Sequence, residues 1–277
     1  MKSKFRYSQL TLLLSLLFVC SCQAQKEQYA DLQFSPFNTQ QKFHIEEDPT
    51  APAASYKLKL FYASQGEEQT KNWLNKQLIH ILFGEEYALQ NLSFQEAAQQ
   101  YTQAYKEEYL SDVTEPYLEQ LKNEPDQMSH WYNYEFQSQA ELISYQKDIL
   151  TLKTFTEMYS GGAHGMYSTN YFNFDLRNKT LIYLADIFEE GYQTKLVELL
   201  LAQLRADFQT EDLLEHMITA SDVYPTENFL IGAEGITFCY TPYEIAAYAA
   251  GEIEVTLSYK QLKSLLRTAP ESILQRM

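Results

Sequence analysis

An alternation of side chains between residues 132 and 142 limits what this chain can fold into. One set of positions is aromatic, apolar or small, and the set between them is polar or charged; the first is Tyr132, Tyr134, Phe136, Ser138, Ala140 and Leu142, and the second is Asn133, Glu135, Gln137, Gln139 and Glu141. Because successive side chains of a β-strand point to opposite faces, this pattern predicts a strand with one face on a core and one in water. Such strands are typical of antiparallel sheets.

Two more strands are predicted directly after this one. Residues 145–148 predict a turn, residues 149–159 a returning antiparallel strand, and residues 166–176 a third strand. Between the last two lies Ser160-Gly161-Gly162-Ala163-His164-Gly165, which holds three of the nine glycines of the chain. Glycine at this density indicates a backbone that needs positive φ angles or a close approach to a neighbour.

Helical periodicity occupies other parts of the chain. Apolar residues follow a helical spacing over residues 68–83 and 192–208, and Ser93 with Glu96 predicts a capping box that opens another helix. A last helix is expected after Ser258. Helices separated from hairpin-linked strands predict an α+β fold, mainly an antiparallel sheet with packed helices in two closely associated subdomains.

The first 21 residues have the composition of a signal peptide. Three basic residues, at positions 2, 4 and 6, precede an apolar run over residues 10–19, which is shorter than a typical membrane-spanning helix. The run leads into Val19-Cys20-Ser21-Cys22, which looks like a lipobox with Cys22 as the lipidated residue. An ordinary secretory signal with a chance cysteine is the alternative.

A lipidated Cys22 would place the protein in the cell envelope, anchored to a membrane and facing the periplasm or the exterior. Gln23 follows the cysteine where Asp would indicate inner-membrane retention, which favours the outer membrane in an organism that has one. Residues 22–52 are polar and contain three prolines, so we expect a tether there. Loss of the three basic residues changes the formal net charge from −16 to −19. Nucleic acid is therefore excluded as a partner, and a basic partner is favoured.

Several motifs together resemble a known family. They are Tyr159-Ser160-Gly161-Gly162-Ala163-His164-Gly165, Asn173-Phe174-Asp175-Leu176, Tyr240-Thr241-Pro242-Tyr243-Glu244-Ile245-Ala246 and Tyr248-Ala249-Ala250-Gly251. Over residues 157–277 this combination is similar to the RsiV-like C-terminal domain family, formerly a domain of unknown function. Residues 53–156 resemble the PdaC-like, deacetylase-associated domain that often precedes it.

The resemblance implies a cell-envelope protein. One relative is a membrane-anchored anti-sigma factor whose extracellular part binds lysozyme, and another is a peptidoglycan deacetylase in which this region accompanies a separate catalytic domain. The Asp-Asp and His-x-x-x-His metal pattern of that catalytic domain has no counterpart in this sequence.

The candidate site is the glycine-rich loop with the acidic and tyrosine residues of the motifs. Its members are Tyr159, Gly161, Gly162, His164, Gly165, Asp175, Tyr243 and Glu244. His164 is either a general base or recognition residue, or a turn histidine bonded to backbone. Asp175 and Glu244 are either a carboxylate pair for glycoside chemistry, at separations of roughly 5 to 10 Å, or groups that cap turns. No histidine pair has a metal-ligand spacing, so neither a metal nor another cofactor is expected, and Cys239 is predicted to be an inert core thiol.

The sequence therefore favours a lipid-anchored, non-catalytic binding module for a cell-wall component or for a protein such as lysozyme. The alternatives are a peptidoglycan-acting hydrolase or deacetylase-associated enzyme, and a structural outer-membrane lipoprotein.

Overall fold

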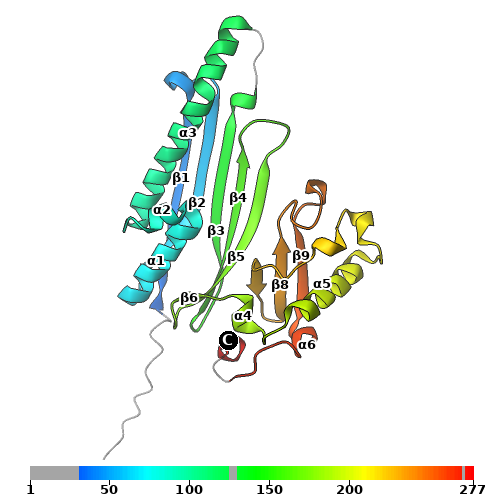
Figure 1. Cartoon of the computed structure of the whole chain (residues 1–277). Helices are drawn as coiled ribbons and strands as arrows, with labels where there is room; N and C mark the ends of the chain where they lie inside the picture. The colour runs from blue at the N-terminus through cyan, green and yellow to red at the C-terminus, as the bar shows by residue number, and fades with distance from the viewer. Residues whose placement is uncertain (1–30, 125–129, 270–271) are drawn as a thin grey trace, which may run out of the picture.

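The computed structural model describes residues 31–124, 130–269 and 272–277. They form a long six-stranded sheet with helices on one face, and beside it a smaller module built on a three-stranded sheet (Figure 1). The signal peptide and Cys22 lie outside the described residues.

The large sheet has its strands in chain order, from β1 to β6. The strands are β1 (Gln33–His44), β2 (Ala53–Gln65), β3 (Tyr134–Gln146), β4 (Ile149–Tyr159), β5 (Met166–Asp175) and β6 (Thr180–Leu181). Every neighbouring pair is antiparallel except β2 and β3, which are parallel. A parallel pair needs a long crossover, and the helices between β2 and β3 provide it.

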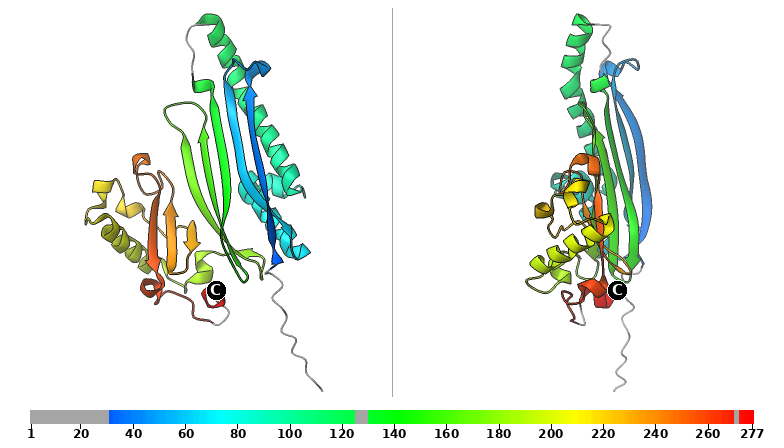
Figure 2. Two further views of the ribbon diagram at one scale, coloured as in Figure 1. Left: turned by 180° about the vertical axis from the view of Figure 1, so that it is seen from behind. Right: turned by 90° about the vertical axis from the view of Figure 1, so that its right-hand side faces the viewer.

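The crossover helices cover one face of the sheet. They are α1 (Glu68–Phe83), α2 (Glu85–Ala88) and α3 (Phe94–Asn123), followed by the short helix η3 (His130–Tyr132). Figure 2 shows them together on one side of the sheet. Ser93 and Glu96 form the predicted capping box at the start of α3. The rings of Tyr56 and Phe136 stack at 5.3 Å beneath α3, so the alternating strand turns its apolar side to the helices as predicted.

The C-terminal module has its own core. Its elements are α4 (Leu184–Ile187), α5 (Gln193–Phe208), η4 (Leu213–His216), η5 (Ala220–Asp222), β7 (Phe229–Ile231), β8 (Gly235–Tyr240), η6 (Tyr248–Ala250), β9 (Ile253–Ser258), α6 (Tyr259–Leu262) and α7 (Ile273–Arg276). The hairpin predicted near residues 229–240 is present as β7 and β8. Leu196, Leu200 and Leu204 of α5 are fully buried against this sheet.

Side chains of the C-terminal module cover the free edge of β5. The amide of Asn228 accepts a hydrogen bond from the Tyr171 N–H at 2.8 Å and donates one to the Thr169 carbonyl at 2.8 Å. The Glu252 carboxylate accepts from the Thr169 N–H. One Asn side chain thus replaces the peptide group of a neighbouring strand, which leaves less of this edge open for pairing.

A buried ion cluster joins α7 to the large sheet. The Arg276 guanidinium donates to Asp148 at 2.7 Å and to both carboxylate oxygens of Asp175. Asp175 also accepts hydrogen bonds from the backbone N–H groups of Arg177 and Asn178. The last described helix is therefore held against the end of β5 by charge-assisted bonds.

The α+β fold class is confirmed, but two features of the predicted organisation were wrong. Residues 33–44 form β1, where a tether was expected. The sequence of β1 shows no clear alternation of apolar and polar residues, because Pro36 and the polar residues after it interrupt the pattern. An edge strand tolerates both proline and polar side chains. The expected boundary at residues 156 and 157 falls inside β4, because the large sheet continues through β5 and β6. Among the described residues, no helix combines the length and apolar character needed to cross a membrane.

Candidate functional site

The loop between β4 and β5 meets the segment between β8 and β9 at one surface. We call the side chains of Trp131, Tyr159, His164, Tyr243 and Tyr248 the loop surface. The rings of His164 and Tyr248 stack with centroids 4.3 Å apart, and the Tyr243 ring lies 5.4 Å from Tyr248. Trp131 is 60% exposed and Tyr243 57% exposed. Large aromatic side chains at this exposure favour a contact surface over a core.

Glycines set the backbone of the loop. Gly161 and Gly162 have φ angles of 87° and 91°, which L side chains rarely adopt. A Cβ atom on Gly161 would lie 2.9 Å from the Trp131 carbonyl oxygen, and one on Gly165 would lie 2.7 Å from the Met158 carbonyl oxygen. The Tyr159 hydroxyl donates to the Gly162 carbonyl at 3.0 Å. Gly161 thus allows the loop to approach η3 closely, and Gly165 allows it to approach the end of β4.

A strained turn presents Tyr243. Its φ angle is 74°, a value that costs a bulky residue free energy and is found mainly where surrounding contacts enforce it. Glu244 supplies those contacts, because its carboxylate accepts the Thr241 N–H at 2.7 Å and its own N–H donates to the Thr241 carbonyl at 3.1 Å. The Tyr224 hydroxyl also donates to Glu244. Glu244 therefore fixes the turn, as the turn-capping alternative proposed.

His164 has polar contacts on both ring nitrogens. Its Nδ1 lies 2.8 Å from the Gly165 carbonyl oxygen, which requires a proton on that nitrogen, and Nε2 lies 3.5 Å from the Tyr243 hydroxyl. The Tyr248 hydroxyl donates to the same carbonyl at 2.9 Å. Among the described residues, neither hydrogen-bond partner of the imidazole is a carboxylate, so the geometry favours recognition or backbone bonding over general base catalysis.

Asp175 lies away from the loop surface. It ends β5, whereas His164 and Gly165 precede that strand, and ten residues at about 3.3 Å each separate the two ends by roughly 30 Å. Since Tyr243 contacts His164, the neighbouring Glu244 is at the loop end of the strand. The separation between the Asp175 and Glu244 carboxylates therefore exceeds that of a carboxylate pair for glycoside chemistry. Asp175 instead belongs to the Arg276 cluster.

The other chemically reactive groups offer no alternative centre in the described part of the chain. Burial raises the pKa of the Cys239 thiol to about 12, and the side chain is fully buried, as expected of an inert core thiol. Within residues 31–124, 130–269 and 272–277, no three His, Cys, Asp or Glu side chains are placed to hold a metal ion.

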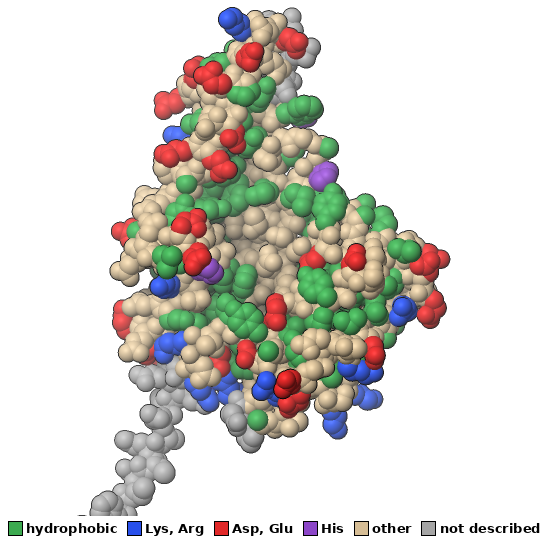
Figure 3. All heavy atoms as spheres, in the orientation of Figure 1, with side chains coloured by type: hydrophobic (Ala, Val, Ile, Leu, Met, Phe, Trp, Pro, Cys, Tyr) green, Lys and Arg blue, Asp and Glu red, His purple; other side chains and the backbone are tan. Residues whose placement is uncertain are grey.

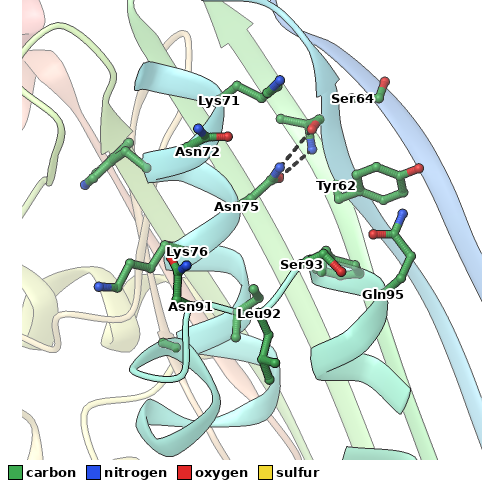
Figure 4. Close-up of a pocket in the computed structure, with 15 residues that line it drawn as sticks. Tyr62, Ser64, Lys71, Asn72, Asn75, Lys76, Asn91, Leu92, Ser93 and Gln95 are labelled. Atoms are coloured by element: carbon green, nitrogen blue, oxygen red, sulfur yellow. Dashed lines mark hydrogen bonds between the residues drawn. The ribbon is translucent and has the colours of Figure 1, made fainter. Parts of the chain in front are cut away.

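A groove of about 660 Å³ lies between β2, α1 and the start of α3. Figure 4 shows the Asn75 amide turned toward the backbone of β2, and it bonds both the N–H and the carbonyl of Ala63 at 2.8 Å. Lys71, also on this groove, pairs with Glu68 at 2.7 Å. These groups already have partners, and none of the residues predicted for the site lies here.

Two members of the loop surface were missing from the predicted site. Tyr248 belongs to a motif that the sequence shows, but nothing in its spacing indicates that it stacks on His164. Trp131 precedes β3, and the β3–β4 register, in which Glu135 lies opposite Tyr159, brings it to the loop that follows β4. The predicted hairpin could therefore have indicated Trp131, whereas the Tyr248 contact depends on the docking of the C-terminal module and has no local signal.

Comparison with known proteins shows which family and which relatives this chain resembles. The model of a family described as a protein of unknown function, DUF3298, matches residues 185–260. A peptidoglycan-N-acetylmuramic acid deacetylase, PdaC of Bacillus subtilis, is 27% identical over 131 residues. That match covers 46% of this chain and 28% of the deacetylase, so the chain corresponds to under a third of that relative.

Two solved structures share the whole fold. A DUF3298 family protein from Pseudomonas aeruginosa has a TM-score of 0.57 at 13% identity, over 86% of this chain and 95% of that one, and shows the same fold. A DUF3298 member from Bacteroides fragilis has a TM-score of 0.81 and is 32% identical, over 87% of this chain and 95% of that one. With this identity across nearly the full length of a solved member, the chain belongs to the DUF3298 family.

Proposed function

We propose that this protein is a non-catalytic binding module of the cell envelope, which takes a basic, lysozyme-like protein on its loop surface. The observation that carries the proposal is the ring cluster of the exposed His164 and Tyr243 with the half-buried Tyr248, assembled from two segments of different modules. Strain at Tyr243 is maintained by Glu244, although the ring itself is largely in solvent. Strain of this kind is concentrated at functional sites.

Acidic groups beside the loop surface suit a cationic partner. Glu157 is exposed on β4, which leads into the loop, and Glu135 is exposed on the neighbouring β3, directly opposite Tyr159 in the ladder. The net charge of −16 also attracts a cationic partner, over longer distances than these two side chains do. Complementary charge mainly increases the association rate and makes binding salt-dependent, while buried aromatic side chains supply most of the affinity.

The envelope location rests on the sequence. A lipidated Cys22 would hold the chain on a membrane, the outer one where present, and residues 23–32 would then link the anchor to β1. The likeness to part of the PdaC deacetylase supports an envelope context. Incorporation of labelled palmitate into the wild type, and its loss in Cys22→Ser, is the expected result; equal labelling of both would contradict the anchor.

The binding proposal is tested with the chain that begins at Gln23, immobilised and exposed to envelope extract and to purified lysozymes at low and high salt. We expect a captured basic protein whose binding weakens as salt rises. Binding to purified peptidoglycan in place of any protein would overturn the proposed partner class. Capture of no partner from any preparation would contradict the binding function itself.

A further inference from the structure

The face of the large sheet that carries the helices is hollowed where they do not cover it. Figure 3 shows this hollow between the crossover helices and the C-terminal module, and much of its floor is neither hydrophobic nor charged. The crossover helices cover the side of β1 to β3, and the C-terminal module flanks β5 (Figure 1). The central strands β3, β4 and β5 therefore provide the floor.

The ladder places hydroxyl and amide side chains side by side on that floor. Phe136 faces the helices, so every second residue of β3 from Phe136 onward points to the same face of the sheet. Residues directly opposite one another on neighbouring strands also point to the same face. Ser138 pairs with Thr156, Thr156 with Ser168, and Thr154 with Asn170. We call Ser138, Thr154, Thr156, Ser168 and Asn170 the hydroxyl floor. It carries no formal charge.

Three hydroxyls of this floor have no hydrogen-bond partner within the described part of the chain. Ser138 is 4% exposed and Thr154 6% exposed, yet neither hydroxyl makes a hydrogen bond to any residue that the structure describes, and the same holds for Thr156. None of the three hydroxyl oxygens is fully buried, so they open onto the hollow, where water or a ligand can bond to them. By contrast, Thr151 on the opposite face of β4 is buried and bonds Asn173 at 3.0 Å.

A pocket of about 290 Å³ adjoins the hydroxyl floor and shares Asn170 with it. Phe172 and Tyr183 line this pocket, and Tyr183 is 51% exposed. Glu227 lines it too; one carboxylate oxygen accepts the Leu184 N–H at 2.9 Å, and the other has no hydrogen-bond partner among the described residues. The pocket thus adds two aromatic faces and one acceptor to a neutral floor.

We propose that the hollow binds a neutral oligosaccharide, with the hydroxyl floor bonding sugar hydroxyls and the Phe172 and Tyr183 rings packing against the sugar's C–H faces. Neutral hydroxyl and amide groups both donate and accept, as sugar hydroxyls do, whereas an ionic ligand would need opposite charge on the floor. Few convergent polar groups beside aromatic walls are the usual composition of a small-ligand site. This site is separate from the loop surface, so neither proposal depends on the other.

The test uses the chain that begins at Gln23, with cellotetraose and tetra-N-acetylchitotetraose as probes in calorimetry and in NMR titration. We expect saturable binding of at least one tetrasaccharide. Thr154→Val and Thr156→Val keep the side-chain volume and remove one hydroxyl each, so each is expected to weaken binding about fivefold to tenfold. Thr256→Val, exposed on β9, is the matched control and should bind like the wild type.

Stability separates a ligand-binding hydroxyl from a structural one. Because no described residue bonds the Thr154 hydroxyl, Thr154→Val should leave the melting temperature unchanged or raise it. Thr151→Val, which removes a buried bond to Asn173, should lower it. Absence of binding by both probes, unchanged affinity in both hydroxyl variants, or a lowered melting temperature for Thr154→Val would overturn the proposal.

Discussion

The ring of Tyr248 lies flat against the imidazole of His164, with 4.3 Å between the ring centroids and 23° between the ring planes. This contact joins the loop between β4 and β5 to the segment before β9. We expect Tyr248→Ala to lower the free energy of unfolding by about 2 kcal/mol, since it removes a half-buried ring and its stacking contact with His164. Tyr248→Phe keeps the stack and loses only the bond to the Gly165 carbonyl, so about 1 kcal/mol is expected. Urea unfolding measures both, and equal losses would show that the stack contributes nothing.

Gly161 and Gly162 differ in the space around them, although both have positive φ angles. Alanine at either position carries the same backbone cost of about 1 kcal/mol. Only at Gly161 would the new Cβ also press on the Trp131 carbonyl, whereas nothing lies within 4 Å at Gly162. Gly161→Ala should therefore lower the melting temperature more than Gly162→Ala. The reverse order would mean that η3 does not pack on the loop as described.

Two arginines share Asp148, and their burial predicts different costs of removal. The Arg276 side chain is 7% exposed and the Arg177 side chain 42% exposed, each with a nitrogen 2.7 Å from an Asp148 oxygen. Arg276→Met leaves the buried Asp175 without its cation and Asp148 with Arg177 alone, and should cost about 3–5 kcal/mol. Arg177→Met removes the more exposed cation and leaves the buried Asp148 its bond to Arg276, so it should cost less, about 1 kcal/mol. Denaturant unfolding of the two variants compares them directly, and a larger loss for Arg177→Met would refute this account of the cluster.

The same cluster predicts that the free energy of unfolding depends on pH in the acidic range. Burial alone would raise the pKa of Asp175, but hydrogen bonds from Arg276 and Asn178 outweigh it and hold the pKa below its ordinary value. A pKa lowered in the folded state stabilises the protein above the unfolded-state pKa, near about 3.9, and this contribution is lost as the pH falls through the folded-state pKa. Asp175→Asn should therefore lose less stability than the wild type between neutral pH and about pH 3. Parallel stability curves for the two proteins would contradict this prediction.

Local patterns in the sequence were enough to predict much of the large sheet. The alternation around Phe136 predicts β3 and its buried face, the spacing over residues 68–83 predicts α1, and Ser93 with Glu96 predicts the start of α3. In each case the pattern is local, because it reflects the side of one strand or helix that faces the core or the hydrogen bonds at one helix end. The strand β1 escaped prediction because it is an edge strand, where Pro36 and polar residues are tolerated and alternation weakens.

The arrangement of the candidate site could be predicted only in part. The glycine loop and Tyr243 were recognised as a group, and the structure brings His164 and Tyr243 together. Asp175 was grouped with them although β5 holds it at the far end of the sheet. The role of Asn228, which completes the edge of β5, depends on the docking of one module on the other and has no signal in the sequence.

Binding of a basic protein at the loop surface is the central claim, and one comparison tests it most directly. Affinity for a purified lysozyme is measured for the wild type, for Tyr243→Ala and for Leu89→Ala, at low and at high salt. Tyr243 is 57% exposed and Leu89 70% exposed, so neither truncation should disturb the core. We predict salt-sensitive binding that Tyr243→Ala weakens at least about tenfold, as removal of a central aromatic contact does, and that Leu89→Ala leaves unchanged. Equal affinity of the wild type and Tyr243→Ala would contradict the account.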